Sequence, residues 1–519
     1  MSVTFSRRAI LTGLLSSAAG VALAEAPLVS PRPNGRTGAV DVAPETSPIP
    51  RIAPRVRATI EEMIAAADLD GTVGCVLADA DTGEMLEQID AGVALPPASV
   101  TKAVTALYAL DALGGAFRFV TRIYATAPVE GGILRGDLIL AGGGDPTLSA
   151  DHLAELADAL KASGVTEVTG RFLCWRGALP YAEEIEPSQL DHLGYNPAVS
   201  GLNLNYNRVY FEWAQSGGDW RVTLDARTEN PGPPVSMARV RIVDRGSPVF
   251  ATDAPDSWTV ARSALGNGGS RRMPVRQPAL YAGDVFQTLA GRAGLTLPAP
   301  DVIDDLPQDR AELAQHASAT LRTILQEMLL YSTNLTAEVC GLAATQAKFA
   351  TSLDINASAA QMTRWLGQKY GITCDFVDHS GLSDQNRISG GDMVKILLAV
   401  GPDGPLRPIM RRIAMTDQDN NRLEDYPIEV RAKTGTLNFV SALAGYIKTA
   451  EGSDLVFTIF AVNLERRAQG KASGDEVPEG SIAWNRRAKR LQQRLLQRWG
   501  LVYRNDDLQD TTDQVLVTD

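Results

Sequence analysis

The sequence LPPASVTKAVTALYALDAL at residues 95–113 decides how the rest of the chain can be organised. Its two prolines end any extended structure, and the run rich in Ala, Val and Leu that follows predicts a buried helix over 99–113. Side chains three positions apart lie on the same helical face, so Ser99 and Lys102 can reach hydrogen-bonding distance in the first turn. The stretch therefore predicts a serine and a lysine held together at the start of a buried helix.

This pair can generate a nucleophile. A serine hydroxyl attacks well only when a neighbour accepts its proton, and a lysine can accept it only if burial or nearby positive charge keeps the amine neutral. Arginine cannot take this part because its pKa is too high. Only nine of the 49 basic residues are lysines, so the lysine at position 102 carries more weight than it would in most chains. The alternative is an ordinary capping serine followed by a solvated lysine.

A second short motif, Ser332-Thr333-Asn334, falls where the predicted helices 318–331 and 334–349 meet. Such a junction can present both polar side chains from a turn. The Ser332 hydroxyl can relay a proton to a leaving amine, and the Asn334 amide can orient a peptide group and the lysine of the first motif. Helix capping is the alternative, since serine and asparagine are common at helix starts.

The third motif, Lys433-Thr434-Gly435, ends the predicted strand 428–432, with Thr436 just beyond it. The edge of a strand can bind an extended peptide as an added strand, while Lys433 and the threonine hydroxyls receive a carboxylate. The alternative is an exposed strand end with a solvated lysine. Each of the three patterns occurs once in the chain, so their order carries more information than any one of them.

The composition of the chain changes twice, which predicts an α/β (α+β) fold in which one domain is split by an insertion. Short alternating segments separated by Gly, Pro, Asn and Asp turns predict that the insertion is β-rich. The predicted segments are an export signal (1–26), a proline-rich linker (27–50), the first part of the split domain (51–118), the insertion (119–306), the second part of the domain (307–502) and a flexible tail (503–519). Further helices are predicted over 55–68, 355–370, 389–400 and 480–499, and strands over 73–80, 84–89, 439–448 and 454–463.

The amino terminus resembles a twin-arginine export signal, because Ser6-Arg7-Arg8 precedes an apolar run that ends in Ala22-Leu23-Ala24. The run from Ala9 to Ala24 is shorter than the roughly 20 residues that a membrane-spanning helix needs, which favours a cleaved signal over an anchor. The sequence thus predicts a periplasmic protein without a transmembrane segment once the signal is removed.

The predicted helix 480–499 carries six basic residues beside two tryptophans and three leucines. Such a helix can lie weakly on an anionic membrane surface, or it can pack its apolar side on the sheet and leave its charges in water. The second interpretation is favoured.

The net charge of −12 and the lack of a long basic patch exclude an electrostatic footprint for nucleic acid. Cys75, Cys174, Cys340 and Cys374 match no metal-site spacing, and we expect no metal or organic cofactor. Buried free thiols are favoured, although disulfide pairing in an oxidising compartment stays open.

The order S-x-x-K, S-x-N, K-T-G, with the insertion between the first two motifs, resembles that of the penicillin-recognising serine enzymes. Together with GGGDPTL at 142–148, YNPAVS at 195–200 and DHSGLS at 378–383, it is similar to the D-alanyl-D-alanine carboxypeptidase/endopeptidase family called penicillin-binding protein 4. The resemblance covers about residues 51–500. It implies a transpeptidase/β-lactamase-like domain with an antiparallel sheet flanked by helices, and a periplasmic serine D,D-peptidase that hydrolyses D-alanyl-D-alanine of peptidoglycan stem peptides.

The resemblance also implies a role for each motif residue. The catalytic residues are Ser99 as acylated nucleophile, Lys102 as its base and Ser332 as proton relay. The substrate-binding residues are Asn334, Lys433, Thr434, Gly435 and Thr436. The backbone N–H groups of Ser99 and Thr436 form the oxyanion hole, and β-lactam antibiotics acylate the same serine.

Two positions depart from the family pattern. Thr333 stands where relatives often have an acidic or amide residue, and His379 stands where a glycine is expected before Ser-Gly-Leu. Both can alter substrate preference, and the alternative for His379 is a satisfied loop histidine without a role.

Two other functions stay open. One is a serine β-lactamase or esterase on the same scaffold, which the long insertion argues against because such enzymes are generally compact. The other is a non-catalytic penicillin-fold binding module, which the complete set of motifs argues against.

Overall fold

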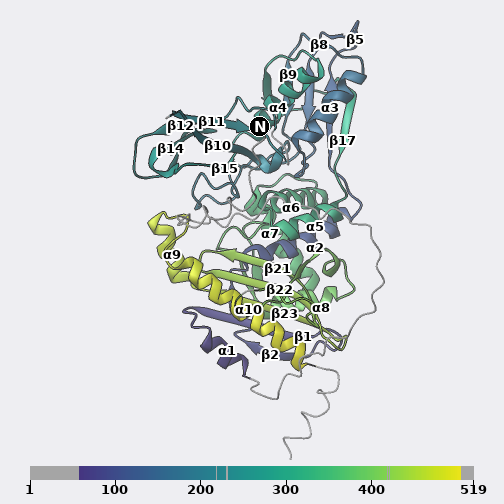
Figure 1. The fold of residues 1–519 in the computed structure, drawn as a ribbon. Coiled ribbons are helices and arrows are strands. Elements are labelled where there is room, and N and C mark those ends of the chain that lie inside the picture. The colour runs from purple at the N-terminus through teal and green to yellow at the C-terminus, as the bar shows by residue number, and fades with distance from the viewer. Residues whose placement is uncertain (1–57, 218, 229–231, 418, 420, 504–519) are drawn as a thin grey trace, which may run out of the picture. The chain divides into compact units, whose positions relative to one another are not determined.

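The computed structural model describes residues 58–217, 219–228, 232–417, 419 and 421–503 (Figure 1). The predicted export signal (1–26), the predicted linker (27–50) and residues 504–519 of the predicted tail lie outside them. Within the described part, a sheet with helices on both faces is accompanied by an insertion that has sheets of its own. The predicted α+β class is therefore confirmed.

Strands from both ends of the chain form one six-stranded antiparallel sheet of order β2-β1-β23-β22-β21-β20. The bounds are β1 Thr72–Asp79, β2 Met85–Ile89, β20 Arg411–Ile413, β21 Glu429–Leu437, β22 Val440–Lys448 and β23 Asp454–Val462. Strand β1 pairs with β23, and Cys75 lies opposite Ile459. The sheet can close only after the chain has returned from the insertion, so the predicted split of the domain is confirmed.

Helices α1 (Ile60–Ala66) and α10 (Ser481–Val502) pack on one face of this sheet. Figure 1 shows α10 running across the strands. The apolar side of α10 is buried in one cluster with sheet residues, and its members there include Trp484, Leu491, Leu495, Leu496 and Trp499. The favoured interpretation of the helix predicted over 480–499, packing on the sheet, is confirmed. In the described ranges, no helix combines the length and the apolarity that crossing a bilayer requires.

The other face of the sheet carries the helices that surround α2. Their bounds are α2 Thr101–Leu113, α5 Leu321–Tyr331, α6 Asn334–Phe349, α7 Ile355–Tyr370 and α8 Gly390–Val400. Every residue of α2 from Thr101 to Ala109 is buried, as expected for a helix inside a core. The predicted start of this helix at Ser99 differs from the structure, in which Ala98–Val100 form a separate 3₁₀ turn. Ala98 has a φ of 46°, and this left-handed conformation bends the chain before the α-helix begins.

The insertion contains a five-stranded sheet of order β16-β9-β7-β4-β17, with helices α3 (Ala150–Ala162) and α4 (Pro278–Ala293) packed against it. The bounds of its strands are β4 Val120–Ala125, β7 Leu138–Ala141, β9 Phe172–Trp175, β16 Pro300–Ile303 and β17 Ala311–Ala317. The β-rich prediction for 119–306 omitted the two helices. The signal was present in α3, where buried Leu153, Leu156 and Leu160 follow helical spacing.

The predicted boundary at residue 306 separates two strands that pair with each other. Strand β17 is antiparallel to β4, and Ala317 lies opposite Val120. Nothing local in the sequence shows which strand β17 will join. We infer that the insertion extends to Ala317, after which the chain returns to α5.

Three further sheets belong to the insertion, and a small one outside it lies beside the nucleophile motif. The sheets of the insertion have the orders β11-β10-β15 (Asp219–Asp225, Arg208–Ser216, Gly268–Pro274), β12-β14-β13 (Arg239–Val243, Ser257–Ala261, Phe250–Ala254) and β5-β6-β8 (Val129–Glu130, Ile133–Leu134, Glu167–Val168). The small sheet joins β3 (Ala94–Leu95), β19 (Arg387–Ser389) and β18 (Cys374–Asp375). Because Leu95 pairs with Ile388, the chain is anchored four residues before Ser99.

The four cysteines are free and lie on different elements, β1, β9, α6 and β18. Cys75, Cys174 and Cys340 are buried, and Cys374 is partly buried. Burial raises the pKa of the Cys75 and Cys374 thiols to about 12, which leaves little thiolate at neutral pH. The free thiols favoured from the sequence are what the described residues contain.

Helix α6 packs closely on His379, and this contact predicts a stability effect. A Cβ added at Gly341 would overlap the His379 ring, which is fully buried. We expect Gly341→Ala to lower the free energy of unfolding by about 1–3 kcal/mol, as overpacked core positions do. Chemical denaturation of the purified protein measures this.

Gly291 is the matched control, because it also lies in a helix, α4, and a Cβ there would meet nothing within 4 Å. We expect Gly291→Ala to be neutral or to raise the free energy of unfolding by up to about 1 kcal/mol. Equal effects of the two substitutions would contradict the packing argument.

Candidate active site

Two of the three motifs and the 378–383 segment meet at the side-chain nitrogen of Lys102. Its Nζ donates to the Ser99 hydroxyl at 2.9 Å, to Asn334 Oδ1 at 2.7 Å and to the carbonyl of Ser380 at 2.6 Å. These partners come from the 3₁₀ turn before α2, from the first residue of α6, and from the DHSGLS segment. The fold thus brings together residues that are 232 and 278 positions from Lys102 in the sequence.

The close approach of two backbones positions Ser99. A Cβ on Gly435 would lie 2.6 Å from the carbonyl oxygen of Pro97 and 3.0 Å from the amide nitrogen of Ser99. A Cβ on Gly381 would overlap the carbonyl of Ala98. Glycine is therefore required at both positions, because any side chain would push β21 or the 378–383 segment away from the nucleophile turn.

Burial controls the charge of Lys102. The side chain is fully buried, and burial lowers its pKa to about 7, although the negative charges of Asp378 and Glu338 act in the opposite direction. A substantial fraction of the amine is therefore neutral near neutral pH, as a base for the serine proton must be. Ser99 itself is only partly buried, so its hydroxyl lies between the buried amine and solvent.

Ser332 and Lys433 form a second pair of the same kind. Ser332 follows α5 with a φ of 60°, which ends that helix and turns the chain into α6 two residues later. Lys433 Nζ donates to the Ser332 hydroxyl at 2.9 Å and to the carbonyl of Thr434 at 2.7 Å. Burial, and next the positive charge of Lys102, lower the pKa of Lys433 well below its usual range. Ser332 and Asn334 are two residues apart and accept from Lys433 and Lys102 respectively, so the two pairs share one site.

The Asn334 amide is oriented from both ends. Its Oδ1 accepts from Lys102, and its Nδ2 donates to the carbonyl of Tyr195 at 2.9 Å. Tyr195 belongs to the insertion, in the YNPAVS segment. The insertion therefore reaches the site, a contact that the sequence could not indicate because it spans 139 positions.

Strand β21 presents an edge next to Ser99. Its pairing with β20 reaches only as far as Ala432, opposite Arg411, whereas its pairing with β22 continues to Leu437. In the described part of the chain, the segment from Lys433 to Leu437 is thus free of a neighbouring strand on one side. Thr434 is partly exposed and Thr436 is exposed, so both hydroxyls are accessible to a ligand on this edge.

The 378–383 segment is held rigidly behind Lys102. Asp378 accepts hydrogen bonds from the backbone nitrogens of Gly381 at 2.6 Å and Ser383 at 2.7 Å, and from Asn386 Nδ2 at 2.7 Å. His379 is fully buried, and its Nε2 lies 2.8 Å from the Ser358 hydroxyl. Burial lowers the pKa of His379 to about 3, so the ring is neutral and serves packing. Its Nδ1 has no partner among the described residues.

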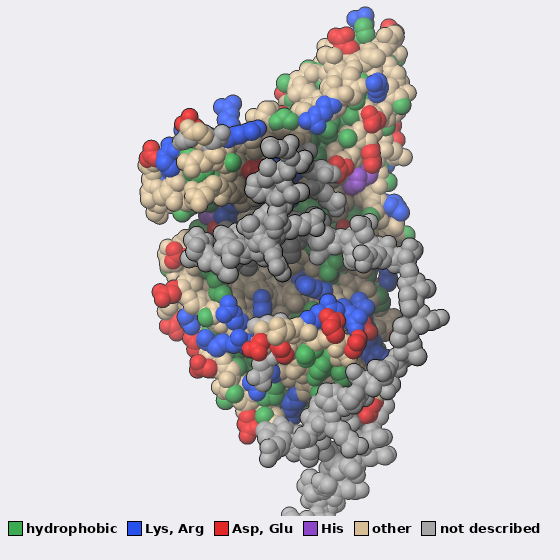
Figure 2. All heavy atoms as spheres, viewed as in Figure 1, with side chains coloured by type: hydrophobic (Ala, Val, Ile, Leu, Met, Phe, Trp, Pro, Cys, Tyr) green, Lys and Arg blue, Asp and Glu red, His purple; other side chains and the backbone are tan. Residues whose placement is uncertain are grey.

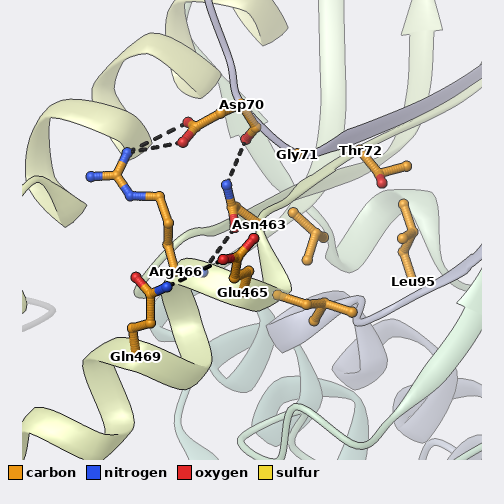
Figure 3. Close-up of a pocket in the computed structure, with 10 residues that line it drawn as sticks. Asp70, Gly71, Thr72, Leu95, Asn463, Glu465, Arg466 and Gln469 are labelled. Atoms are coloured by element: carbon orange, nitrogen blue, oxygen red, sulfur yellow. Dashed lines mark hydrogen bonds and ion pairs between the residues drawn. The ribbon is translucent and has the colours of Figure 1, made fainter.

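A cavity in the surface lies apart from this site. It has a volume of about 500 Å³ and opens at the start of α9 (Leu464–Ser473), where Asp70, Asn463 and Arg466 interact (Figure 3), and none of the eight predicted site residues lines it. On the face drawn in Figure 2, acidic and basic side chains lie next to one another instead of forming a field of one sign. No group of three or more His, Cys, Asp or Glu side chains within the described ranges is placed to hold a metal ion.

Known proteins with a similar sequence are carboxypeptidases. The chain is 28% identical over 440 residues to a D-alanyl-D-alanine carboxypeptidase of Actinomadura sp. (strain R39), a match that covers 78% of this chain and 80% of that protein. It is 24% identical over 428 residues to the D-alanyl-D-alanine carboxypeptidase DacB of Haemophilus influenzae, covering 75% and 85% of the two chains.

The fold is similar to that of a solved structure. The crystal structure of penicillin binding protein 4 from Haemophilus influenzae superposes with a TM-score of 0.69 at 19% identity, and the match covers 85% of this chain and 99% of that one. The family model of the D-Ala-D-Ala carboxypeptidase 3 (S13) peptidases matches residues 56–477, a range that includes all three motifs and the whole insertion. The chain therefore belongs to the D-Ala-D-Ala carboxypeptidase 3 (S13) family of peptidases.

Proposed function

We propose that this chain is a serine D,D-peptidase that hydrolyses the D-alanyl-D-alanine bond of peptidoglycan stem peptides through an acyl-Ser99 intermediate. The observation that carries the proposal is the fully buried Lys102, whose Nζ lies 2.9 Å from the Ser99 hydroxyl. Membership of the S13 family and the carboxypeptidase relatives support the same substrate class.

In acylation, neutral Lys102 takes the proton of Ser99, and Oγ attacks the carbonyl carbon of the penultimate D-alanine. The carbonyl oxygen becomes an oxyanion, which the backbone N–H groups of Ser99 and Thr436 stabilise. The C–N bond then breaks. Ser332 donates its hydroxyl proton to the leaving amine and regains one through Lys433, whose Nζ is 2.9 Å away. Lys433 in turn receives the proton that Lys102 took from Ser99, so both lysines end acylation in the charge state in which they began it.

Substrate binding uses the free edge of β21. An extended peptide adds to this edge by main-chain hydrogen bonds, and Lys433 with the hydroxyls of Thr434 and Thr436 receives its terminal carboxylate. Gly435 keeps the strand close to Ser99, and Asn334 holds the substrate amide. In deacylation, Lys102, neutral again, accepts a proton from the water that attacks the ester, and it returns this proton to Ser99 Oγ as the ester C–O bond breaks. If the leaving amine belongs to a cross-link instead of a free D-alanine, the same chemistry is an endopeptidase reaction.

We further propose that the chain works in the periplasm after export by the twin-arginine route. The signal motif at residues 6–11 and the short apolar run behind it support this. A peptidase for cell-wall peptides must also meet its substrate outside the cytoplasm.

The mass of the intact protein after incubation with benzylpenicillin tests whether Ser99 is the nucleophile. We expect benzylpenicillin to add one penicilloyl group to the wild-type protein and none to Ser99→Ala, because the β-lactam ring opens onto the serine hydroxyl. Intact-protein mass spectrometry measures the adduct, and release of D-alanine from a D-Ala-D-Ala peptide measures the reaction. If penicillin is consumed quickly without an adduct, the protein is a β-lactamase. If penicillin survives intact and no D-alanine is released, the binding-module alternative holds.

The base is tested by replacing Lys102 with arginine, which keeps the positive charge but cannot lose its proton. We expect Lys102→Arg to lower the acylation rate by about 10²–10⁴-fold, the usual contribution of a general base. In the wild-type protein the rate rises with pH through about 7, where the folded-state pKa of Lys102 lies, because only the neutral amine is active. The second-order rate of penicillin acylation between pH 5.5 and 7.5 measures both effects. Lys369→Arg, on the far end of α7, is the matched control and should acylate like wild type.

The export route is tested by replacing Arg7 and Arg8 together with lysine. We expect the precursor to stay in the cytoplasm, because the pathway requires the arginine pair. Cell fractionation followed by immunoblotting measures this, and the same double change at Arg55 and Arg57 is the control. Normal export of the first variant would contradict the twin-arginine proposal without affecting the enzymatic one.

A further inference from the structure

The free edge of β21 ends at the hairpin that leads into β22. In the proposed reaction, Lys433 and Thr434 receive the terminal carboxylate and the oxyanion lies at the N–H of Thr436. A peptide added to this edge therefore has its carboxyl end at Lys433, and the residues before the scissile bond extend past Thr436. Because a strand advances about 3.3 Å per residue, the residue before the D-alanyl-D-alanine pair reaches the hairpin at Asn438.

The insertion supplies the opposite wall of this groove. Lys433 on β21 donates to Ser332, and Asn334, two residues later, donates to the carbonyl of Tyr195 at 2.9 Å. Tyr195 thus lies across the site from the edge of β21, and its side chain is exposed. We call residues 192–196 the Tyr195 wall. A peptide bound on the edge of β21 is able to contact both this wall and the hairpin.

One carboxylate joins the Tyr195 wall to the hairpin. Glu476, which follows α9, accepts from His192 Nε2 at 3.1 Å and from Arg271 Nη2, on β15, at 2.9 Å (Figure 1). Both of its side-chain oxygens therefore bind the insertion. Its backbone carbonyl accepts from Asn438 Nδ2 at 3.1 Å. Since His192 is three residues before Tyr195, Glu476 connects the two sides of the groove at the end that the upstream part of a peptide would reach.

The insertion presents its two donors to Glu476 from one aromatic support. The guanidinium of Arg271 lies 4.8 Å from the centre of the Phe250 ring, and the His192 ring stacks on the same ring with centroids 4.9 Å apart. Arg271 is buried, and among the described residues Glu476 is the hydrogen-bond acceptor of its side chain. A buried charge requires such a partner, so this contact is stronger than an ion pair in water.

We propose that Glu476 is a positioning residue that holds the Tyr195 wall against the substrate groove, and that peptides extending beyond the D-alanyl-D-alanine pair bind more tightly because of it. The proposal rests on the proposed function, because it concerns binding of the same substrate. A wall that is already in place loses little conformational entropy when a peptide binds. The D-alanyl-D-alanine pair itself lies between Lys433 and Thr436, so it gains least from the Glu476 contact.

Release of D-alanine from peptides of three lengths tests the proposal. N-acetyl-D-Ala-D-Ala ends near Thr436, whereas N-acetyl-L-Lys-D-Ala-D-Ala and a pentapeptide that ends in the same pair pass the hairpin. Glu476→Gln keeps the size of the side chain but turns one acceptor into a donor that faces His192 or Arg271. We expect its loss of kcat/KM to be about tenfold greater for the two longer peptides than for the dipeptide, and to appear in KM.

Glu479→Gln is the matched control, because Glu479 lies in the same segment, is exposed and forms no ion pair in the described part of the chain. It should match wild type at every length. Arg271→Met keeps an apolar stem against Phe250 while it removes the partner of Glu476. Combining it with Glu476→Gln should add little to the larger single effect, since both substitutions break one contact.

Two kinetic results would overturn the proposal. One is an equal loss of kcat/KM at all three lengths, which is the effect expected if Glu476 acts only through Asn334 or on stability. The other is a variant that matches wild type at every length.

A second measurement does not require turnover. Amide hydrogen exchange followed by mass spectrometry should be faster over residues 185–200 in Glu476→Gln than in wild type, with β22 and β23 unchanged. Unchanged exchange over 185–200, or faster exchange in β22 and β23 as well, would contradict a specific role in holding the wall. If the wild-type protein releases no D-alanine from any of the peptides, the proposed function fails, and the exchange result still decides whether Glu476 holds the Tyr195 wall.

Discussion

The burial of one amine, Lys102 Nζ, is the constraint on which the rest of the structure depends. An ammonium group removed from water is costly unless acceptors surround it or its pKa falls, and here both occur. Its three acceptors come from the turn before α2, from α6 and from the 378–383 segment. Those elements lie in both parts of the split domain. The six-stranded sheet, which joins β1 to β23, is what brings the two parts together around the nitrogen.

The site is arranged in two layers, and this arrangement accounts for its chemistry. Ser99 and Ser332 are partly exposed, whereas Lys102 and Lys433 behind them are buried. The substrate therefore contacts hydroxyl groups, which can form and break covalent bonds. The buried amines behind them accept and donate the protons of those hydroxyls in surroundings of low dielectric constant. In that medium the charge of one lysine opposes the charge of the other, which is why the pKa of Lys433 is lowered by Lys102 as well as by burial. A pair of solvated lysines at the same positions would stay charged and could not act as bases.

Local patterns predicted the elements of the split domain and the eight motif residues, because each signal lies within a few positions. The spacing of Ser99 and Lys102, the helix junction at Ser332 and the strand before Lys433 are examples. The pairing of β17 with β4, which moves the end of the insertion to Ala317, depends on a partner far along the chain. Glu476 was missed for a similar reason, since its two partners in the insertion lie 284 and 205 positions away.

The insertion affects the electrostatics of the site and is more than an appendage. An amide can point either its oxygen or its NH₂ group at Lys102, and the second orientation would place donors against an ammonium. The carbonyl of Tyr195 accepts from Asn334 Nδ2 and so leaves Oδ1 for the lysine. A second contact holds this part of the insertion in place. Glu476, between α9 and α10, binds His192 at 3.1 Å and Arg271 at 2.9 Å, and these bonds lower its pKa to about 2 although burial alone would raise it. A change in how the insertion packs would therefore reach Lys102 through a single amide group.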